Sequence, residues 1–581
     1  MESKGQKITG SAWWWLVLLV IINFIASAFH TRIDLTREKR YTLSNASKDL
    51  VKNLDEDVEI DVFLKGDFPA GFRKLANSTG DFLELLKDRN NSKIHYRFIS
   101  PQDKIGDTGK AWGDSLVGLG AVPINLTVQL EAGQSTNFVF PVAVMRYKGR
   151  ESLVNLLYPG AGGKISQDEI NSAEALMEYQ FANALNKLVN EKKPAIGYAV
   201  GNGEPVDART FDLVQTLGKD NDFFMFDLRS QSVVPSDFDV LLIVKPTEQF
   251  TEEEKFKLDQ YVMQGGKLFC FIDNLIAEQD SLSYSKGETI AYDRNLNLTD
   301  LFFRYGLRIN TDLIMDLQCD MIPFVVGGTQ ESPQLEFLHW NYYPLLNSSS
   351  NKLNNLGYIA GRFVNSIDTI NVAGIKKSVL LSTSPNSRTI STPARISLNE
   401  NRNAPEDAQF KKNGIPAAML LEGKFTSLYK NRVTQVQRDT LTANGLRFIN
   451  ESGKENKIIV VADGDLVFND FIPGQDGKPL PLAMGWNKYT YREYQEQTQF
   501  GKLFIPVANK EFLLNSIEYL VNNPAISETR NKDIVLRLLD SQKVKQQKFK
   551  WQSINILLPI LLIIIAGMVY QQLRRRKYAK V

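Results

Sequence analysis

Two segments of the chain, one near each end, are long, apolar and uncharged. Residues 13–29 open with three tryptophans and hold seventeen positions without a charge, and residues 554–570 form a second uncharged run. A helix rises about 1.5 Å per residue, so seventeen residues span roughly 26 Å, close to the ~30 Å hydrocarbon core of a bilayer. Tryptophan also favours the membrane interface. The pattern therefore predicts a transmembrane helix at each end.

The first of these segments has a second interpretation, a cleavable signal peptide. Lys4 and Lys7 precede it, and the small residues at 26–28 resemble a cleavage site. Both interpretations send the chain that follows across the membrane. The second segment contains Pro559, which a membrane helix tolerates, and ends in the basic run Arg574–Lys577. Basic residues lie on both sides of both segments, so the charge distribution alone leaves the orientation in the membrane open. The signal-like start and the basic tail together favour an exported middle.

Strand and helix periodicities alternate in the first half of the exported region. Apolar residues alternate over 58–64, recur at helical spacing over 70–88, and alternate again over 94–98, which predicts a β-α-β unit. The same reasoning predicts a helix over 45–53 with Ser44 as its N-cap, strands within 126–157, and a closing helix over 167–191.

Nearly continuous apolar strands begin at residue 194. The segments 194–200, 239–246 and 267–273 are separated by helical patterns, of which one starts with a capping box formed by Thr251 and Glu254. Strands that are apolar on both faces favour a parallel, doubly wound sheet covered by helices on both sides. Further strands of this sheet are expected at 377–384, 417–423 and 457–465, and the polar stretches 275–300, 346–358 and 384–414 are expected to be surface loops.

The fold class predicted from these patterns is α/β, with an exported body of two α/β domains between two transmembrane helices. The expected boundaries are a cytoplasmic N-terminus (1–12), a transmembrane helix or signal anchor (13–29), a first α/β domain (30–192), a second α/β domain (193–470), a helical segment leading to the membrane (471–552), a transmembrane helix (553–571) and a basic cytoplasmic tail (572–581).

Composition narrows the class of protein without identifying a partner. The 68 basic and 66 acidic residues leave a net charge of +2, so no global field attracts the chain to nucleic acid. Apolar residues make up 43% of the 581 positions, which is ordinary for a folded protein. Two cysteines, Cys270 and Cys319, cannot form a disulfide framework, and we expect both to be buried structural thiols.

Residue types that carry catalysis are scarce. No two of the three histidines, His30, His95 and His339, and the two cysteines lie within metal-ligand spacing, and no nucleophile elbow is present. The glycine-rich run at 160–164 lacks the Ser or Thr that a phosphate loop places after its lysine. Asp463 and Asp465 could hold a cation at a strand end, but a solvated loop is the favoured interpretation. We therefore expect no catalytic, cofactor or metal site.

Two weaker candidates remain. Asn202 and Glu204 follow an apolar strand, where α/β folds place ligand loops, but a structural strand-to-helix turn is the favoured interpretation. An aromatic cluster comprises Phe337, Trp340, Tyr342 and Tyr343. Packing in a core or between domains is the favoured interpretation, and Trp340, Tyr342 and Tyr343 as a partner surface is the alternative.

Several stretches, in order along the whole chain, resemble the auxiliary, so-called substrate-binding, subunit of bacterial ABC transporters. They are RIDLTREKRYTLS after the first apolar segment, the stretch 239–273, and IPAAMLLEGKFTSLYKNR at 415–432. The closing sequence, 501–540 followed by KWQSINILLPILL, is similar to the gliding-motility-associated GldG branch. This resemblance implies an anchored protein of the bacterial inner membrane with a periplasmic body. It implies as partners a GldA-like ATPase and a GldF-like permease, besides the lipid bilayer, and no nucleic acid.

The resemblance also implies that the second domain has a fold like that of class I glutamine amidotransferases. Enzymes of that fold need a cysteine nucleophile with a histidine and an acid, and this chain departs from the pattern. A non-enzymatic transporter accessory in gliding motility, and in secretion of surface proteins, is therefore the first functional expectation. A structural scaffold of a motility or secretion machine that binds no ligand is the alternative, and an envelope hydrolase is the third.

Overall fold

The computed structural model forms two units, Met1–Lys532 and Asp533–Val581. It describes residues 17–18, 42–490, 507–521, 529 and 541–578, apart from internal gaps at 91, 107–109, 122, 131–132, 158–166, 191, 285–286, 330–331, 349–355, 399–406, 435–437, 440–446 and 475–476. The predicted N-terminal span at 13–29, except for the helical residues Val17 and Leu18, and the glycine-rich run at 160–164 lie outside the described residues.

The first part of the larger unit is a four-stranded sheet with helices on both faces. Its elements are α2 (Asn45–Lys52), β1 (Val58–Val62), α3 (Ala70–Arg89), β2 (Ile94–Phe98), α4 (Trp112–Gly118), β3 (Ile124–Leu130), β4 (Gly133–Val139), β5 (Val142–Tyr147), β6 (Arg150–Asn155) and α5 (Gln167–Val189). The strand order is β2-β1-β5-β6, and β1 pairs with β2 in parallel across α3, which confirms the predicted β-α-β unit. The Ser44 side chain accepts a hydrogen bond from the Ser47 N–H at 3.1 Å, as expected of an N-cap.

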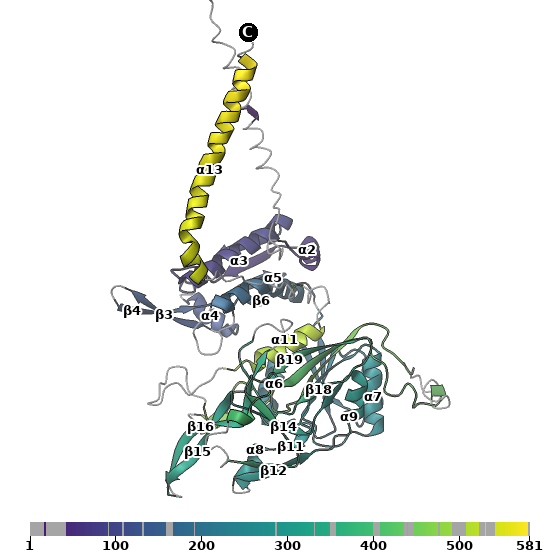
Figure 1. Cartoon of the computed structure of the whole chain (residues 1–581). Helices are drawn as coiled ribbons and strands as arrows, with labels where there is room; N and C mark the ends of the chain where they lie inside the picture. Colours follow the sequence, from purple (N-terminus) through teal and green to yellow (C-terminus); the bar gives the residue numbers. More distant parts are fainter. Residues whose placement is uncertain are drawn as a thin grey trace, which may run out of the picture. The chain divides into compact units, whose positions relative to one another are not determined.

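A larger mixed sheet dominates the second part. Its elements are β7 (Ala195–Val200), η2 (Ala208–Thr210), α6 (Phe211–Asp220), β8 (Asp222–Asp227), β9 (Val240–Val244), α7 (Glu252–Met263), β10 (Lys267–Phe271), α9 (Thr299–Tyr305), β15 (Cys319–Gly328), β16 (Pro333–Ser348), β17 (Ile359–Ala360), β19 (Ile375–Ser382), β22 (Pro416–Gly423), β23 (Asn456–Val461) and α11 (Asn509–Val521). Among the described residues it is ten-stranded, with the order β15-β16-β19-β22-β23-β10-β9-β7-β8 and β17 beside β16. The run from β23 to β8 is parallel, and the run from β15 to β22 is antiparallel. Strands β15, β16 and β19 of the antiparallel run are labelled in Figure 1.

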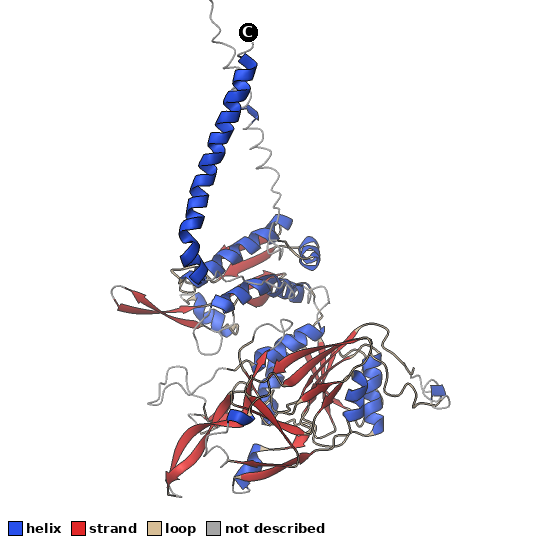
Figure 2. Cartoon of the chain, viewed as in Figure 1, coloured by secondary structure: helices blue, strands red, loops and turns tan. Residues whose placement is uncertain are grey.

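Both faces of the parallel strands are buried, because every position of β9 and nearly every position of β10 is apolar. Phe269 and Phe271 pack with α6 and α11 on one face, while Leu268 and Cys270 pack with α7 and α9 on the other. Figure 2 shows this mixture of helices and strands. The predicted capping box of α7 is present, and the mixed α/β class is confirmed. Helix α11, which we expected in the segment leading to the membrane, instead completes this core.

Two of the polar stretches expected to be surface loops contain regular structure. Residues 275–300 contain β11 (Leu275–Ile276), α8 (Gln279–Tyr284) and β12 (Glu288–Asp293), and residues 384–414 contain β20 (Ser387–Ser391), β21 (Ala394–Ser397) and η4 (Asp407–Gln409). Outside these stretches the chain also forms β13 (Leu307–Ile309), β14 (Asp312–Asp316), β18 (Ile367–Thr369), β24 (Phe471–Pro473) and β25 (Pro479–Pro481). All of these strands are short and, apart from the almost wholly buried β14, they are partly exposed, so their apolar pattern is weak. In β12, for example, Ala291 is buried while Ile290 and Tyr292 are more than half exposed. Hairpin β24–β25 likewise lies where a helical segment was expected.

The smaller unit contains α13 (Ser541–Tyr578), a helix of 38 residues. Within its stretch Gln547–Arg576, an 18-residue window reaches a mean hydropathy of 2.4, so this stretch is long and apolar enough to cross a membrane. The predicted span at 553–571 lies inside it, and Pro559 lies near its middle.

Candidate functional site

Charged side chains follow the parallel strands at their carboxyl ends. Lys245 directly follows β9, Asp273 comes two residues after β10, and Asp463 and Asp465 follow β23. Because β9, β10 and β23 are parallel neighbours, their carboxyl ends meet at one edge of the sheet. This is the edge at which α/β folds bind ligands.

Lys245 is the centre of this group and is only 2% exposed. Its ammonium Nζ lies 2.6 Å from Asp465 Oδ1, 3.0 Å from Asp273 Oδ2 and 3.0 Å from Glu278 Oε2. Burial alone would lower the pKa of Lys245, but the three carboxylates outweigh burial and raise it. The residue therefore stays charged. Its φ of 44° is left-handed, a conformation that residues other than glycine adopt mainly where the surroundings hold them there.

Gly464 makes the close approach of β23 to Lys245 possible. A Cβ at this position would lie 2.7 Å from Lys245 Cβ and 3.0 Å from Asp273 Oδ1. The Gly464 N–H also donates a hydrogen bond to Asp273 Oδ1. Any side chain at position 464 would therefore displace the lysine or the aspartate.

Asp463 extends the cluster towards a second buried cation. It accepts hydrogen bonds from the N–H groups of Arg362 and Asp465 at 2.9 and 2.8 Å. The Arg362 guanidinium donates two hydrogen bonds, of 3.1 and 2.7 Å, to Asp470. Burial would raise the pKa of Asp470, but Arg362 outweighs it and holds that pKa below its ordinary value. Burial and the neighbouring carboxylates raise the pKa of Asp463 well above normal.

Carboxylate oxygens of Asp273, Asp463 and Asp465 lie within 4.8 Å of one another, a spacing that could hold a cation. The Lys245 ammonium already contacts two of the three carboxylates. Asp463 is fully buried, so the solvated-loop interpretation of this residue is wrong. The arrangement is a buried ionic network with its own internal cation, and we assign it a structural role.

Asn202 and Glu204 belong to a buried turn that follows β7 and contacts the start of α7. The Asn202 carbonyl accepts hydrogen bonds from the Thr247 and Glu248 N–H groups at 2.9 and 2.8 Å. The Asn202 side chain donates to Glu254 Oε2 at 3.0 Å, and its own N–H donates to Glu204 Oε2 at 2.7 Å. These contacts support a structural turn rather than an open ligand loop.

The Glu204 carboxyl is expected to make stability depend on pH. Burial raises its pKa from 4.5 to about 7, so the folded state holds a proton that the unfolded state releases above pH 4.5. Stability should therefore fall as pH rises from about 4.5 to 7, by on the order of 2–3 kcal/mol. Glu204→Gln should be more stable than the wild type at pH 8 and equal to it near pH 4.5, measured by urea unfolding. A constant difference across this range would contradict the assignment.

The aromatic cluster is a core, which corrects the partner-surface alternative. Trp340, Tyr342 and Tyr343 are 0%, 1% and 2% exposed, so they cannot offer their rings to a partner. They pack with Phe363 at ring-centroid distances of 5.6, 6.4 and 5.7 Å. All three belong to β16 and share a buried cluster with apolar residues of β11, β12, β14, β15 and β21.

Both cysteines are buried, as expected. Cys270 is 0% and Cys319 1% exposed, and burial raises the pKa of both thiols, which disfavours the reactive thiolate. His339 lies beside Cys319, but its Nδ1 is 2.8 Å from the Cys319 backbone carbonyl, and the thiol lies 3.5 Å from Asn341 Oδ1. The His95 side chain is exposed on β2, with Nε2 3.5 Å from Asp57 Oδ2.

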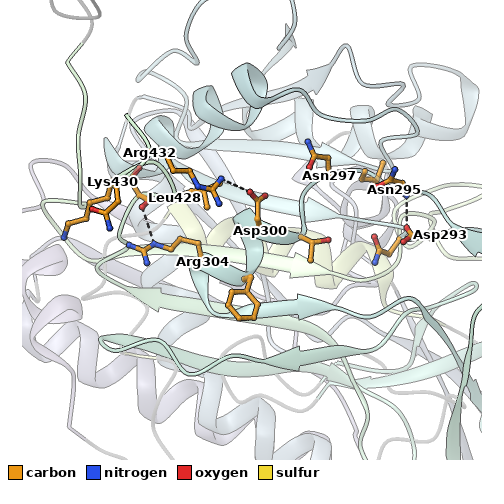
Figure 3. Close-up of a pocket in the computed structure, with 14 residues that line it drawn as sticks. Asp293, Asn295, Asn297, Asp300, Arg304, Leu428, Lys430 and Arg432 are labelled. Atoms are coloured by element: carbon orange, nitrogen blue, oxygen red, sulfur yellow. Dashed lines mark hydrogen bonds and ion pairs between the residues drawn. The ribbon is translucent and has the colours of Figure 1, made fainter. Parts of the chain in front are cut away.

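A polar cleft that the sequence did not indicate lies beside α9. It has a volume of about 710 Å³ and is bounded by the segments 293–300, 303–304 and 427–432 (Figure 3). Three of its lining side chains, Leu296, Phe303 and Leu428, are apolar, and the others are polar or charged. Its elements are far apart in sequence, so no local pattern could have revealed it.

Comparison with known proteins identifies related sequences. A family model described as an ABC-type uncharacterized transport system matches residues 193–515, and a model described as a domain of unknown function matches residues 37–146. An uncharacterized protein of Borreliella burgdorferi is 24% identical over 451 residues, which cover 74% of this chain and 80% of that protein.

Solved structures resemble the chain only weakly. The N-terminal domain of mmIFT52 gives a TM-score of 0.30 at 11% identity, covering 57% of this chain and 98% of that one. The exo-beta-1,4-mannosidase Op5Man5 from Opitutaceae bacterium strain TAV5 gives 0.18 at 11% identity, covering 72% and 50%. Scores this low carry no argument about fold or function.

Proposed function

The chain belongs to the family described as an ABC-type uncharacterized transport system, and from this premise we propose that it is a membrane-anchored, non-catalytic auxiliary component of an ABC transporter. Two features of the chain together support the proposal: residues 193–515 match this family, and α13 is long and apolar enough to cross a membrane. A component of such a system that provides neither ATPase nor channel has to reach the other components at the membrane. Helix α13 offers the means.

The central stretch of α13, residues 556–569, is apolar around its whole circumference. Ile556, Leu562, Ile563 and Tyr570 are 63%, 58%, 71% and 68% exposed. A helix that is apolar on every side needs lipid or other helices around it. The proposed location is the bacterial inner membrane, with α13 and the segment at 13–29 as anchors and the body in the periplasm.

The finer part of the proposal concerns the machine and its partners. The closing sequence resembles the gliding-motility-associated GldG branch, which supports a role in gliding with a GldA-like ATPase and a GldF-like permease. Both thiols are buried, and the charges around Lys245 pair with one another. These features support a body that recognises cargo or transmits the ATPase cycle and does not catalyse a reaction.

Co-purification tests this proposal directly. The full chain, tagged and extracted in mild detergent, should bring an ATPase and a multi-span permease, identified by mass spectrometry. Replacing residues 554–570 by leucines should keep the chain in the membrane fraction, because insertion depends on apolarity, but weaken permease recovery, because contacts specific to the native side chains are lost.

Two outcomes would contradict the proposal. A wild-type chain that repeatedly purifies alone would remove the transporter role and leave the scaffold alternative. A deletion strain of a gliding host that spreads on surfaces as well as its parent would remove the gliding assignment.

A further inference from the structure

The cleft beside α9 has the dimensions of a ligand site. Its volume of about 710 Å³ falls within the range of roughly 300–1,000 Å³ that small-molecule sites occupy. Its walls come from α9, from the segment between β12 and α9, and from the turn that follows β22 (Figure 3). A ligand of this cleft would have to match those polar and charged groups of its walls that have no protein partner.

Some of the charged groups in the cleft already neutralise one another. Asp300 Oδ1 lies 3.0 Å from Lys255 Nζ, and Asp300 Oδ2 lies 3.0 Å from a terminal nitrogen of Arg432. Burial would raise the pKa of Asp300, but these two cations outweigh it and keep the carboxylate ionised. Lys430 pairs in the same way with Glu451. None of these groups needs a ligand to balance its charge.

Two charges in the cleft have no ion-pair partner among the described residues, Arg304 and Asp293. Arg304 uses its Nε to donate to the carbonyls of Thr426 and Ser427 at 3.2 and 3.3 Å, and its two terminal nitrogens are free of protein partners in the described chain. Asp293 Oδ1 accepts the Asn295 N–H at 2.8 Å, which leaves Oδ2 available.

These two unpaired charges lie at opposite ends of the cleft, with Asp300 between them (Figure 3). Asn295 and Asn297 lie near the acidic end, and their amide groups can both donate and accept hydrogen bonds. Phe303 lines the cleft with a ring that is 51% exposed. The cleft is therefore a polar trough with a free cation at one end, a free anion at the other, and Phe303 as its most exposed apolar side chain.

We propose that this cleft binds a short peptide in extended form, with the peptide's terminal carboxylate at Arg304 and its terminal ammonium at Asp293. A guanidinium with two free nitrogens matches a carboxylate in bidentate geometry. The asparagines match the N–H and C=O groups of the peptide backbone, and Phe303 offers a surface to one side chain. A neutral oligosaccharide would use the amides but would leave both free charges unpaired.

The inference goes beyond the proposed function, which names no ligand. A negative binding result would leave the proposed function untouched, because peptide binding is measured on the purified full chain without transporter partners. Binding of an alanine series from dipeptide to hexapeptide is followed by isothermal titration calorimetry in detergent. One length should bind best, because only one places both termini at the two charges.

Blocking the peptide ends identifies each contact. With the best length, N-terminal acetylation and C-terminal amidation should each weaken binding roughly tenfold or more, since each removes a charge-assisted hydrogen bond. Asp293→Asn keeps the oxygen that accepts the Asn295 N–H but removes the charge. Acetylation should therefore cost nothing further in Asp293→Asn, and amidation should cost nothing further in Arg304→Gln.

Arg308→Gln and Asp368→Asn are matched controls. These residues pair with each other at 2.9 Å on the neighbouring strands, are 51% and 55% exposed in their side chains, and do not line the cleft. Both controls should bind the peptide as the wild type does. Absence of binding across the series, indifference to both end-blocking groups, or binding of neutral oligosaccharides instead would overturn the proposal.

Discussion

Replacing Lys245 by methionine is expected to destabilise the part of the chain that holds the ten-stranded sheet by about 3–5 kcal/mol, because removing one partner of a buried ionic group leaves the other charges unpaired. Methionine has a similar length but cannot neutralise Asp273, Asp465 and Glu278, which contact the ammonium at 3.0, 2.6 and 3.0 Å. Urea unfolding of the full chain, followed by tryptophan fluorescence, measures the loss. The effect should be smaller at pH 5.5 than at pH 8, since the pKa of Asp273 is already raised to about 6 and protonation relieves the repulsion.

Lys510→Met is the matched control for this substitution. Lys510 also forms an ion pair, with Asp212 at 3.1 Å, but its side chain is 40% exposed. Exposed pairs contribute about 0–1 kcal/mol, so this variant should unfold close to the wild type. Equal unfolding midpoints for the two lysine variants would contradict a structural role for the buried network.

Trp340→Ala is expected to cost about 3–5 kcal/mol, the range for removing a large aromatic side chain from a core. The indole is fully buried, with ring centroids 4.9 Å from Tyr343 and 5.6 Å from Phe363. Trp340→Phe should cost less than half as much, because it keeps most ring contacts and removes an indole N–H that has no hydrogen-bond partner among the described residues. Thermal and urea unfolding of the full chain distinguish the two variants.

Tyr292→Ala controls for loss of an aromatic ring as such. Tyr292 is 53% exposed, and its removal should change stability by less than about 1 kcal/mol. If Trp340→Ala were as stable as the wild type but lost the partners recovered by co-purification, the surface interpretation of this cluster would replace the core interpretation.

The features that the sequence predicted correctly are set by neighbouring residues. The Thr251–Glu254 capping box needs only four consecutive positions, and both of its hydrogen bonds are present. Strands β9 and β10 were recognisable because almost every residue is apolar, which requires burial on both faces. Helix α13 was recognisable for the same reason, since its apolar run is uninterrupted.

The features that the sequence did not reveal depend on distant residues. Lys245 and Asp465 are 220 positions apart, and their pairing follows from the adjacency of β9, β10 and β23. A signal was nevertheless present, because Lys245 and Asp273 each stand at the end of a wholly apolar strand, where a lone charge needs a partner. No comparable signal marked the cleft. Arg304 and Asp293 stand out only because the other charged residues near them form ion pairs, and those pairs cannot be read from the sequence.

The length of α13 has a mechanical consequence. Its 38 residues correspond to about 57 Å at 1.5 Å per residue, nearly twice the ~30 Å of a hydrocarbon core. If α13 spans the membrane, as proposed above, roughly half of its length lies outside the hydrocarbon core. Pro559, near the midpoint, cannot donate to the Asn555 carbonyl and so weakens the helix there. A tilt imposed on one half, for instance by a neighbouring subunit that changes shape during its cycle, would swing the other half about this pivot.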